Sequence, residues 1–296
     1  MITIFTTTKP FQGEIEIIQR NALLSWKKLI PQCEIVLFDN EQGSAEIAKE
    51  LGIIHLPEVK KNEYGTPLIS DIFERAQKIG KNKVLAYVNA DIILMKDFLA
   101  AISKINLEKF LMVGRRWDLD IKERINFQNP NWEEEIKEKA KKEGILHGPA
   151  AIDYFVFPKG ILKEIPFFAL GRTAWDNWLL YNAWISDIPL IDATQVIKII
   201  HQNHKAHTPQ KHGSDVWKGP EAKINQKLAG GLSHAFTIRD ASKILTSGGL
   251  KTPRLNLYRI FSFPFRYYEK IPLLKPILFP GWLAMLLWRK QKVSKN

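Results

Sequence analysis

The chain has 296 residues, of which 45% are hydrophobic and 25% charged. This is the composition of an ordinary globular protein with a sizeable core, and it excludes a low-complexity chain. The single cysteine, Cys33, excludes an internal disulfide framework and suits a protein of the reducing cytoplasm. The N-terminus begins directly as a strand, without a basic region followed by an apolar one, so we expect no secretory signal.

The net charge of +12 is placed unevenly along the chain. From residue 251 to the end, ten Lys and Arg residues stand against one acid, Glu269, so this segment carries +9 and the first 250 residues carry +3. The basic excess therefore belongs to a tail and not to a folded basic face. This distribution argues against a nucleic-acid partner.

Strand-like and helix-like segments alternate over the first third of the chain. The pattern predicts strands at 2–5, 34–38, 53–56 and from 84 onward, and helices at 13–29, 44–51, 68–79 and 97–105. This order is typical of a mostly parallel sheet with helices on both faces. We therefore predict an α/β fold.

The apolar run at 84–94 is the segment around which the rest is organised. It ends in Asn89-Ala90-Asp91, and strand alternation places the Asn89 and Asp91 side chains on the same side. The carboxyl ends of strands in open α/β sheets bind ligands, and a carboxylate there suits Mg²⁺ or Mn²⁺ held together with phosphates. The alternative is a strand-to-helix turn in which either residue caps the next element.

Later segments continue the alternation. We predict strands at 110–114, 153–157 and 196–201, a solvated helix at 132–143 and an aromatic-rich helix at 175–184. Glycines and prolines punctuate residues 205–250, which we expect to be an irregular lid or acceptor-binding segment.

Polar residues stand at the ends of apolar elements at three successive places in the sequence: Asn89-Ala90-Asp91, then Asp176, then His201 and His204. Their order resembles the GT-A family of nucleotide-sugar glycosyltransferases. That family has a D-x-D motif after a central strand, a later acid at a helix start beside the acceptor, and often a further metal-binding His. The resemblance covers about residues 1–204. It implies a Rossmann-like GT-A fold, a nucleotide-sugar donor and a divalent metal, Mn²⁺ or Mg²⁺.

The resemblance implies that Asp91 is a direct metal ligand, whereas Asn89, in place of the first Asp, would bind ribose or a metal-bound water. Asn supplies oxygen without charge, so metal affinity should be weaker than with two carboxylates. His201 closes an apolar run just as Asp91 does, and His204 is the competing imidazole ligand. Asp118-Leu119-Asp120 is a rival D-x-D motif, ranked second because it follows two arginines and a tryptophan.

Asp176 is the candidate general base. It lies between Trp175 and Trp178, where partial desolvation would raise its pKa. In an inverting transfer, a carboxylate deprotonates the acceptor hydroxyl as that oxygen attacks the anomeric carbon. In a retaining transfer, Asp176 would instead orient the sugar. A purely structural alternative is that Asp176 is an acid at the N-terminus of a helix, where the helix dipole favours a negative charge.

Residues at strand ends are candidates for holding the donor. The resemblance points to the first two strand ends for the nucleotide, and the arginines fit its diphosphate or an acidic acceptor. Each candidate also fits ordinary turn chemistry or a surface pair. The candidates are Thr6, Thr7, Thr8, Asp39, Thr66, Asn89, Arg115, Arg116 and Asp153.

Residues 251–296 interleave aromatic and aliphatic side chains with Arg and Lys, broken by prolines. The proline-free apolar stretch 281–288 has eight residues, about 12 Å of helix against about 30 Å of hydrocarbon. We therefore expect this extension to lie on a membrane surface instead of crossing it. The alternative is that its apolar residues pack on the main domain or on a partner.

Together these observations predict a GT-A domain at 1–250 and a basic aromatic extension at 251–296. The expected function is metal-dependent sugar transfer to a hydroxyl of a glycan or lipid-linked acceptor, in surface polysaccharide or lipopolysaccharide assembly. The enzyme would lie in the cytoplasm on the inner face of the membrane. A nucleotidyltransferase is disfavoured because the loop after the first strand, residues 6–10, lacks glycine. A non-catalytic adaptor would bind membranes or polyanions without depending on Asp91.

Overall fold

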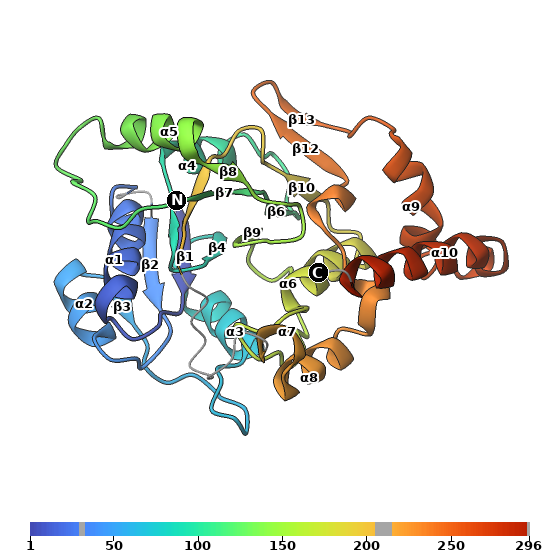
Figure 1. The fold of residues 1–296 in the computed structure, drawn as a ribbon, viewed down its shortest axis with the longest axis horizontal. Coiled ribbons are helices and arrows are strands. Elements are labelled where there is room, and N and C mark those ends of the chain that lie inside the picture. The colour runs from blue at the N-terminus through green and yellow to red at the C-terminus, as the bar shows by residue number, and fades with distance from the viewer. Residues whose placement is uncertain (30–32, 205–214, 295–296) are drawn as a thin grey trace.

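A nine-stranded sheet forms the centre of the molecule (Figure 1). We describe residues 1–29, 33–204 and 215–294 of a computed structural model. The strands pair in the order β13-β12-β10-β6-β9-β4-β1-β2-β3. They are β1 (Ile2–Thr6), β2 (Cys33–Leu37), β3 (Ile54–His55), β4 (Val84–Val88), β6 (Leu111–Val113), β9 (Tyr154–Pro158), β10 (Leu190–Asp192), β12 (Lys243–Thr246) and β13 (Gly249–Lys251).

Most pairings in this sheet are parallel, which confirms the predicted α/β class. The exceptions are β9, which runs antiparallel to β4 and β6, and the β12–β13 hairpin. The β10 strand was not predicted from the sequence. The β12 and β13 strands were not predicted either, whereas the other six strands of this sheet lie within a few residues of their predicted positions.

Helices cover both faces of the sheet because its strands are apolar on both sides. On one face Ile4 and Ala86 pack with residues of α1 (Gly13–Lys27), α2 (Ser44–Leu51) and α4 (Lys96–Ile102). On the other, Phe5 and Tyr87 pack with α3 (Ile69–Ile79) and α6 (Trp175–Ile185). Neighbouring residues of β1 and β4 thus face opposite layers, as strand alternation requires.

A second sheet of four short strands lies beside the first. Its order is β5 (Ile92–Ile93), β11 (Ile199–Gln202), β7 (Arg116–Leu119) and β8 (Ile145–Leu146). Ile93, Leu119 and Ile200 pack beneath α5 (Trp132–Glu143), which covers one face of this sheet. Strand alternation then turns Arg116, Asp118 and His201 to the opposite face.

The predicted run at 84–94 is divided between the two sheets. β4 ends at Val88, the chain turns through Asn89 to Asp91, and β5 begins at Ile92. Asn89 N donates to the Asp153 carbonyl, and Ile92 N donates to the Asn89 carbonyl. The polar residues that end the central strand therefore mark a crossing from one sheet to the other.

The prediction of an irregular segment at 205–250 is wrong for the part that the structure describes, and 205–214 lie outside it. This part forms α7 (Asp215–Lys218), α8 (Pro220–Leu228), two short 3₁₀ turns, η1 (Gly231–His234) and η2 (Ile238–Asp240), and the β12–β13 hairpin. Pro220 stands in the first turn of α8, where its missing N–H is not needed. Gly249, with φ of 100°, shapes the hairpin turn. The prolines and glycines thus begin and connect regular elements.

Two helices form the C-terminal extension: α9 (Leu257–Tyr267) and α10 (Lys275–Ser294), with a 3₁₀ turn η3 (Pro272–Leu274) between them. Pro264 and Pro280 lie inside these helices, so the expectation that the prolines break the extension is wrong for these two, whereas Pro272 begins the turn between α9 and α10. Among the described helices, none is both long and apolar enough to cross a membrane alone. Only α9 taken together with Pro272–Lys290, a pair bent by 107°, meets those criteria of length and composition.

The extension packs onto the main domain through α6 (Figure 1). Phe265 and Met285 are buried in the core layer that contains α6. Trp184 Nε1 donates to the Arg266 carbonyl at 3.0 Å, and Lys270 Nζ lies 2.6 Å from an Asp187 carboxylate oxygen. The helix that begins with Trp175-Asp176 is therefore held at its other end by the extension.

Candidate active site

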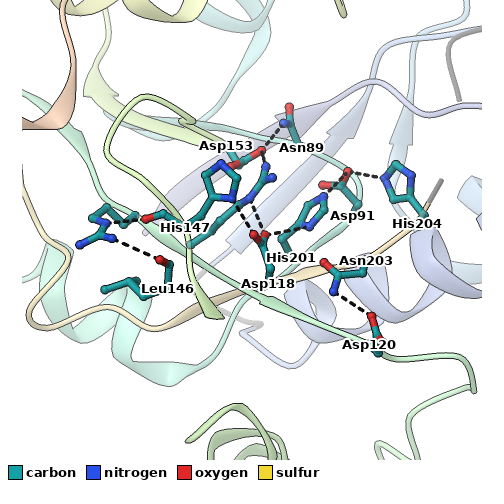
Figure 2. Close-up of polar contacts among 12 residues, drawn as sticks. Asn89, Asp91, Asp118, Asp120, Leu146, His147, Asp153, His201, Asn203 and His204 are labelled. Atoms are coloured by element: carbon teal, nitrogen blue, oxygen red, sulfur yellow. Dashed lines mark hydrogen bonds and ion pairs between the residues drawn. The ribbon is translucent and has the colours of Figure 1, made fainter. Parts of the chain in front are cut away.

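Asp91, His201 and His204 converge where the two sheets meet (Figure 2). One ligand atom from each lies within 4.8 Å of the other two. Asp91 Oδ2 is 3.6 Å from His201 Nε2 and 3.2 Å from His204 Nε2. The structure thus brings together the three residues that the sequence suggested as metal ligands, with both imidazoles directed at one carboxylate.

Strand pairing explains this convergence. β11 pairs antiparallel with β5, and His201 stands opposite Ile92, the residue after Asp91. Gln202, which is fully buried, donates through its backbone N and Nε2 to the Asp91 carbonyl and through Nε2 to the Ile18 carbonyl. The backbone of the Asp91 turn is therefore fixed by the strand that carries the histidine.

The electrostatics of this cluster favour an ionised carboxylate. Burial alone would raise the pKa of Asp91, but the adjacent His201 and His204 outweigh burial and hold that pKa well below its usual range. Burial lowers the pKa of His201, and the Asp91 carboxylate more than compensates, so the net pKa is raised. Asp91 Oδ1 is buried and makes no hydrogen bond within the described residues. An unpartnered carboxylate oxygen beside two imidazoles fits a divalent cation such as Mn²⁺.

Asp118 lies on the far side of His201. Its Oδ1 is 3.2 Å from His201 Nδ1 and accepts a 2.8 Å hydrogen bond from Arg116 Nε, and its Oδ2 is 2.6 Å from His147 Nδ1. Asp120, the other acid of this literal D-x-D motif, instead accepts from Asn203 Nδ2 at 2.8 Å (Figure 2). The motif is thus split between the site and the surface. Sequence reasoning missed His147.

Asp153 and Asn89 extend this polar network toward the large sheet. Asp153 Oδ1 accepts from Asn89 Nδ2 at 2.9 Å and from Arg116 at 2.8 Å. Asp153 Oδ2 is buried and has no hydrogen-bond partner within the part of the chain that is described. Arg115, by contrast, donates to the backbone carbonyls of Leu146 and His147. Only the second of the two neighbouring arginines therefore contacts the acidic residues of the site.

The candidate nucleotide residues lie at the end of β1 (Thr6) or on the loops that follow the first strands. Thr8 donates through its backbone N and its hydroxyl to Asp39 Oδ2, at 2.6 and 2.8 Å. Thr6 donates to the Thr7 carbonyl, and Thr66 N donates to Asn62 Oδ1. The Thr7 side chain partly offsets the rise that burial causes in the pKa of Tyr87. These contacts shape the loops, and none of them joins the Asp91 cluster.

Lys9, on the loop after β1, is a further residue near this cluster that sequence reasoning did not assign to it. Burial lowers the pKa of its ammonium group, and the charge of Asp91 opposes that shift. A half-buried cation whose charge interacts with that of Asp91 is suited to an anionic ligand such as a diphosphate. The sequence signal was weak, since the loop lacks the glycines that usually accompany a phosphate-binding lysine.

Asp176 lies in the first turn of α6, with Ala174 before it in a left-handed conformation at φ of 85°. Burial, with a further contribution from the Asp153 charge, raises the pKa of Asp176 to about 7. Asn177, the next residue, donates to the Phe236 carbonyl at 2.8 Å and anchors this end of the helix. Asp176 thus has the pKa of a general base at neutral pH and lies near enough to sense the Asp153 carboxylate.

No family model matches the chain, and no curated protein sequence does. In fold, 229 solved chains match it. They include residues 1–349 of S. aureus TarS in complex with UDP-GlcNAc, at a TM-score of 0.51 and 13% identity, covering 96% of this chain and 88% of that one. Glucosyl-3-phosphoglycerate synthase from Mycobacterium tuberculosis matches at a TM-score of 0.48 and 12% identity, covering 87% of this chain and 88% of that one. Mannosyltransferase PcManGT from Pyrobaculum calidifontis matches at a TM-score of 0.45 and 14% identity, covering 96% of this chain and 73% of that one.

The likeness to TarS establishes the fold. With a core α/β sheet, a crossing into a second small sheet and the polar residues at that crossing, the chain has the GT-A fold of nucleotide-sugar glycosyltransferases. The resemblance seen in the order of the sequence motifs is confirmed at the level of architecture.

Proposed function

We propose that the protein is a metal-dependent glycosyltransferase. It moves a sugar from a nucleotide-sugar donor to a hydroxyl group of a glycan or lipid-linked acceptor. The observation that carries the proposal is the Asp91, His201 and His204 cluster at the end of β4, with a buried Asp91 oxygen left unpartnered among the described residues. The complex of TarS with UDP-GlcNAc, a protein of the same fold, supports a nucleotide sugar as the donor.

Each residue of the site has a distinct role in this proposal. Asp91, His201 and His204 would hold Mn²⁺ or Mg²⁺, which supplies Lewis-acid stabilisation of the departing nucleoside diphosphate. Lys9 contributes a positive charge that interacts with the charge of Asp91, and it would attract the diphosphate. Asp153 keeps one buried oxygen unpartnered in the described structure, and this atom would accept a hydrogen bond from a sugar hydroxyl.

We assign Asp176 as the general base of an inverting transfer. A carboxylate with a pKa near 7 is ionised in a useful fraction at neutral pH and is basic enough to accept the acceptor's proton. The acceptor oxygen attacks the anomeric carbon as the bond from that carbon to the diphosphate breaks, and its proton passes to Asp176. In the alternative retaining reaction, Asp176 would orient the sugar without taking the proton.

A panel of nucleotide sugars tests the proposal directly. We expect Mn²⁺- or Mg²⁺-dependent release of a nucleoside diphosphate from at least one donor, lost in Asp91→Asn and retained in Asp120→Asn. With an acceptor in hand, the anomeric configuration of the product, read by NMR, distinguishes inversion from retention. A protein that neither binds nor hydrolyses any nucleotide sugar in the presence of metal would contradict the proposal and favour a non-catalytic adaptor.

We also propose that the extension at 251–296 rests on the inner face of the membrane, next to lipid-linked acceptors of surface polysaccharide or lipopolysaccharide assembly. Large apolar side chains along it are exposed, including Leu273 at 91% and Ile277 at 76%. Arg254, Lys275 and Lys290 are exposed among them. Aliphatic and aromatic side chains mixed with cations suit the headgroup region of an anionic bilayer. The proposed boundary after residue 250 falls within β13, one residue before the end of that strand.

A further inference from the structure

The register of the small sheet sets Asp118 beside His201. β7 and β11 run parallel, and their pairing places Asp118 directly opposite His201. Side chains on paired residues share one face of a sheet and lie close enough to interact. Asp118 Oδ1 and His201 Nδ1 are accordingly 3.2 Å apart. This contact therefore follows from the pairing of the two strands and does not depend on two flexible surface side chains meeting.

Both carboxylate oxygens of Asp118 contact other side chains, so Asp118 would not bind the cation directly. Oδ1 is shared by Arg116 and His201, and Oδ2 contacts His147. Within the described residues, the group of atoms close enough to bind one ion contains Asp91, His201 and His204 and does not include Asp118. Any influence of Asp118 on a metal must therefore pass through His201.

His201 has two ring nitrogens with different surroundings. Nε2 faces the Asp91 carboxylate at 3.6 Å. Nδ1 is buried and makes no aligned hydrogen bond to the described residues, so the Asp118 carboxylate is the acceptor available to an Nδ1–H group. A neutral imidazole that carries its proton on Nδ1 presents a lone pair on Nε2, which is the form that binds a metal.

We propose that Asp118 is a positioning residue for His201: it selects the tautomer with the proton on Nδ1 and holds the ring so that Nε2 is ready to bind a divalent cation beside Asp91. Arg116 and His147 in turn hold Asp118, because each donates to its carboxylate. This inference rests on the proposed metal-dependent function. According to this inference, Asp118 on β7 supports the metal site through His201, although the sequence suggested it as part of a rival metal-binding motif.

The same motif supplies a matched control. Asp120 is two residues from Asp118, and its side chain accepts a hydrogen bond from Asn203 at the surface. Asp118→Asn and Asp120→Asn make the same chemical change. Only the first replaces the carboxylate beside His201 with an uncharged amide.

Mn²⁺ binding to the full chain, measured by calorimetry or by the electron paramagnetic resonance of free Mn²⁺, tests the inference. We expect Asp118→Asn to weaken the Mn²⁺ affinity by about 10- to 100-fold, Asp120→Asn to leave it unchanged, and Asp118→Glu to recover part of the loss. In assays, Asp118→Asn should raise the Mn²⁺ concentration needed for half-maximal rate while kcat recovers at saturating Mn²⁺. A purely structural role would lower kcat at every Mn²⁺ concentration.

Nitrogen NMR of the histidine rings in the unsubstituted protein, loaded with Mg²⁺, gives a second measurement that does not depend on whether a variant folds. We expect His201 to carry its proton on Nδ1. A proton on Nε2, or equal Mn²⁺ affinities for Asp118→Asn and the unsubstituted protein, would overturn the inference and leave the metal site standing. Unchanged Mn²⁺ binding by Asp91→Asn would instead overturn the proposed metal site itself.

Discussion

Asp176 illustrates how strongly one residue's surroundings set its chemistry. Its carboxyl lies at the start of α6, where burial and the Asp153 charge raise its pKa to about 7. A base must be ionised to accept a proton, so protonation below this pKa should inactivate it. We expect kcat/KM to fall as the pH decreases through about 7, since kcat/KM reports the pKa of the free enzyme.

Initial rates measured from about pH 5 to about pH 9 check this expectation. Asp176→Asn should lower kcat by about 10²- to 10⁴-fold and remove the acidic limb, while Mn²⁺ and donor binding persist. Asp187→Asn is the control, because Asp187 lies just past the other end of the same helix with its side chain 82% exposed. An acidic limb that survives in Asp176→Asn would assign the base to another residue.

The sequence alone singles out Asp91, His201, His204 and Asp176 as candidates, because each follows or begins an apolar element in a recognisable order. It gives no indication of the role that we propose for Asp118. That role arises from the pairing of β7 with β11, strands separated by some eighty residues, and no local pattern encodes such a partner. The same limit applies to Arg115 and Arg116. Adjacent residues of an extended chain face opposite ways, and the sequence alone does not say which of the two arginines faces the site.

Among the elements, α8 is tied to the segment that leads into α6 by a buried ion pair. Arg172 Nη2 lies 2.6 Å from Glu221 Oε2, and the two side chains are only 4% and 1% exposed. Removing one partner leaves the other charge buried without compensation. We expect Glu221→Gln to lower the free energy of unfolding by about 3–5 kcal/mol.

Urea denaturation measures this loss. The control is Glu74→Gln in α3, which removes an ion pair with Lys78 at the same 2.6 Å distance but on the surface. Water screens that pair, so the urea midpoint should not change measurably. If the two variants lost equal stability, burial would not be what makes the Arg172–Glu221 pair matter.

At the level of elements, long apolar segments were predictable and short or punctuated ones were not. α1, α2, α3 and β4 have the lengths and periodicities that sequence patterns detect. β5, β7 and β8 contain only two to four residues each, and β7 carries Arg116 and Asp118. Such strands exist because they pair with neighbours, not because of intrinsic preference. The β12–β13 hairpin escaped detection because its glycines were interpreted as marking a loop.

The whole molecule is asymmetric in charge and in exposed apolar surface, and both asymmetries support the proposal that the extension binds a membrane surface. We expect the protein to sediment with anionic vesicles and not with zwitterionic ones, with binding that weakens as salt increases. Phe261→Glu combined with Ile277→Glu should abolish binding, because both side chains belong to the exposed apolar set on α9 and α10.

Phe167→Glu is the matched control, since Phe167 is 72% exposed but belongs to the main domain. Equal binding by the double variant and the control would argue against the extension as the membrane contact. A concentration-dependent dimer that the double variant alone disrupts would indicate that a second protein chain covers this apolar face.

The path of the chain through the site also bears on the order in which the molecule is made. Asp91 and His204 are 113 positions apart in the chain, and β11, which lies between β5 and β7 in the small sheet, is synthesised after both of those segments. During synthesis from the N-terminus, the acidic half of the site is therefore present well before the two imidazoles leave the ribosome. Closing so long a loop is entropically costly, so the capacity to hold a cation should appear late in folding and should mark a chain whose two sheets have both formed.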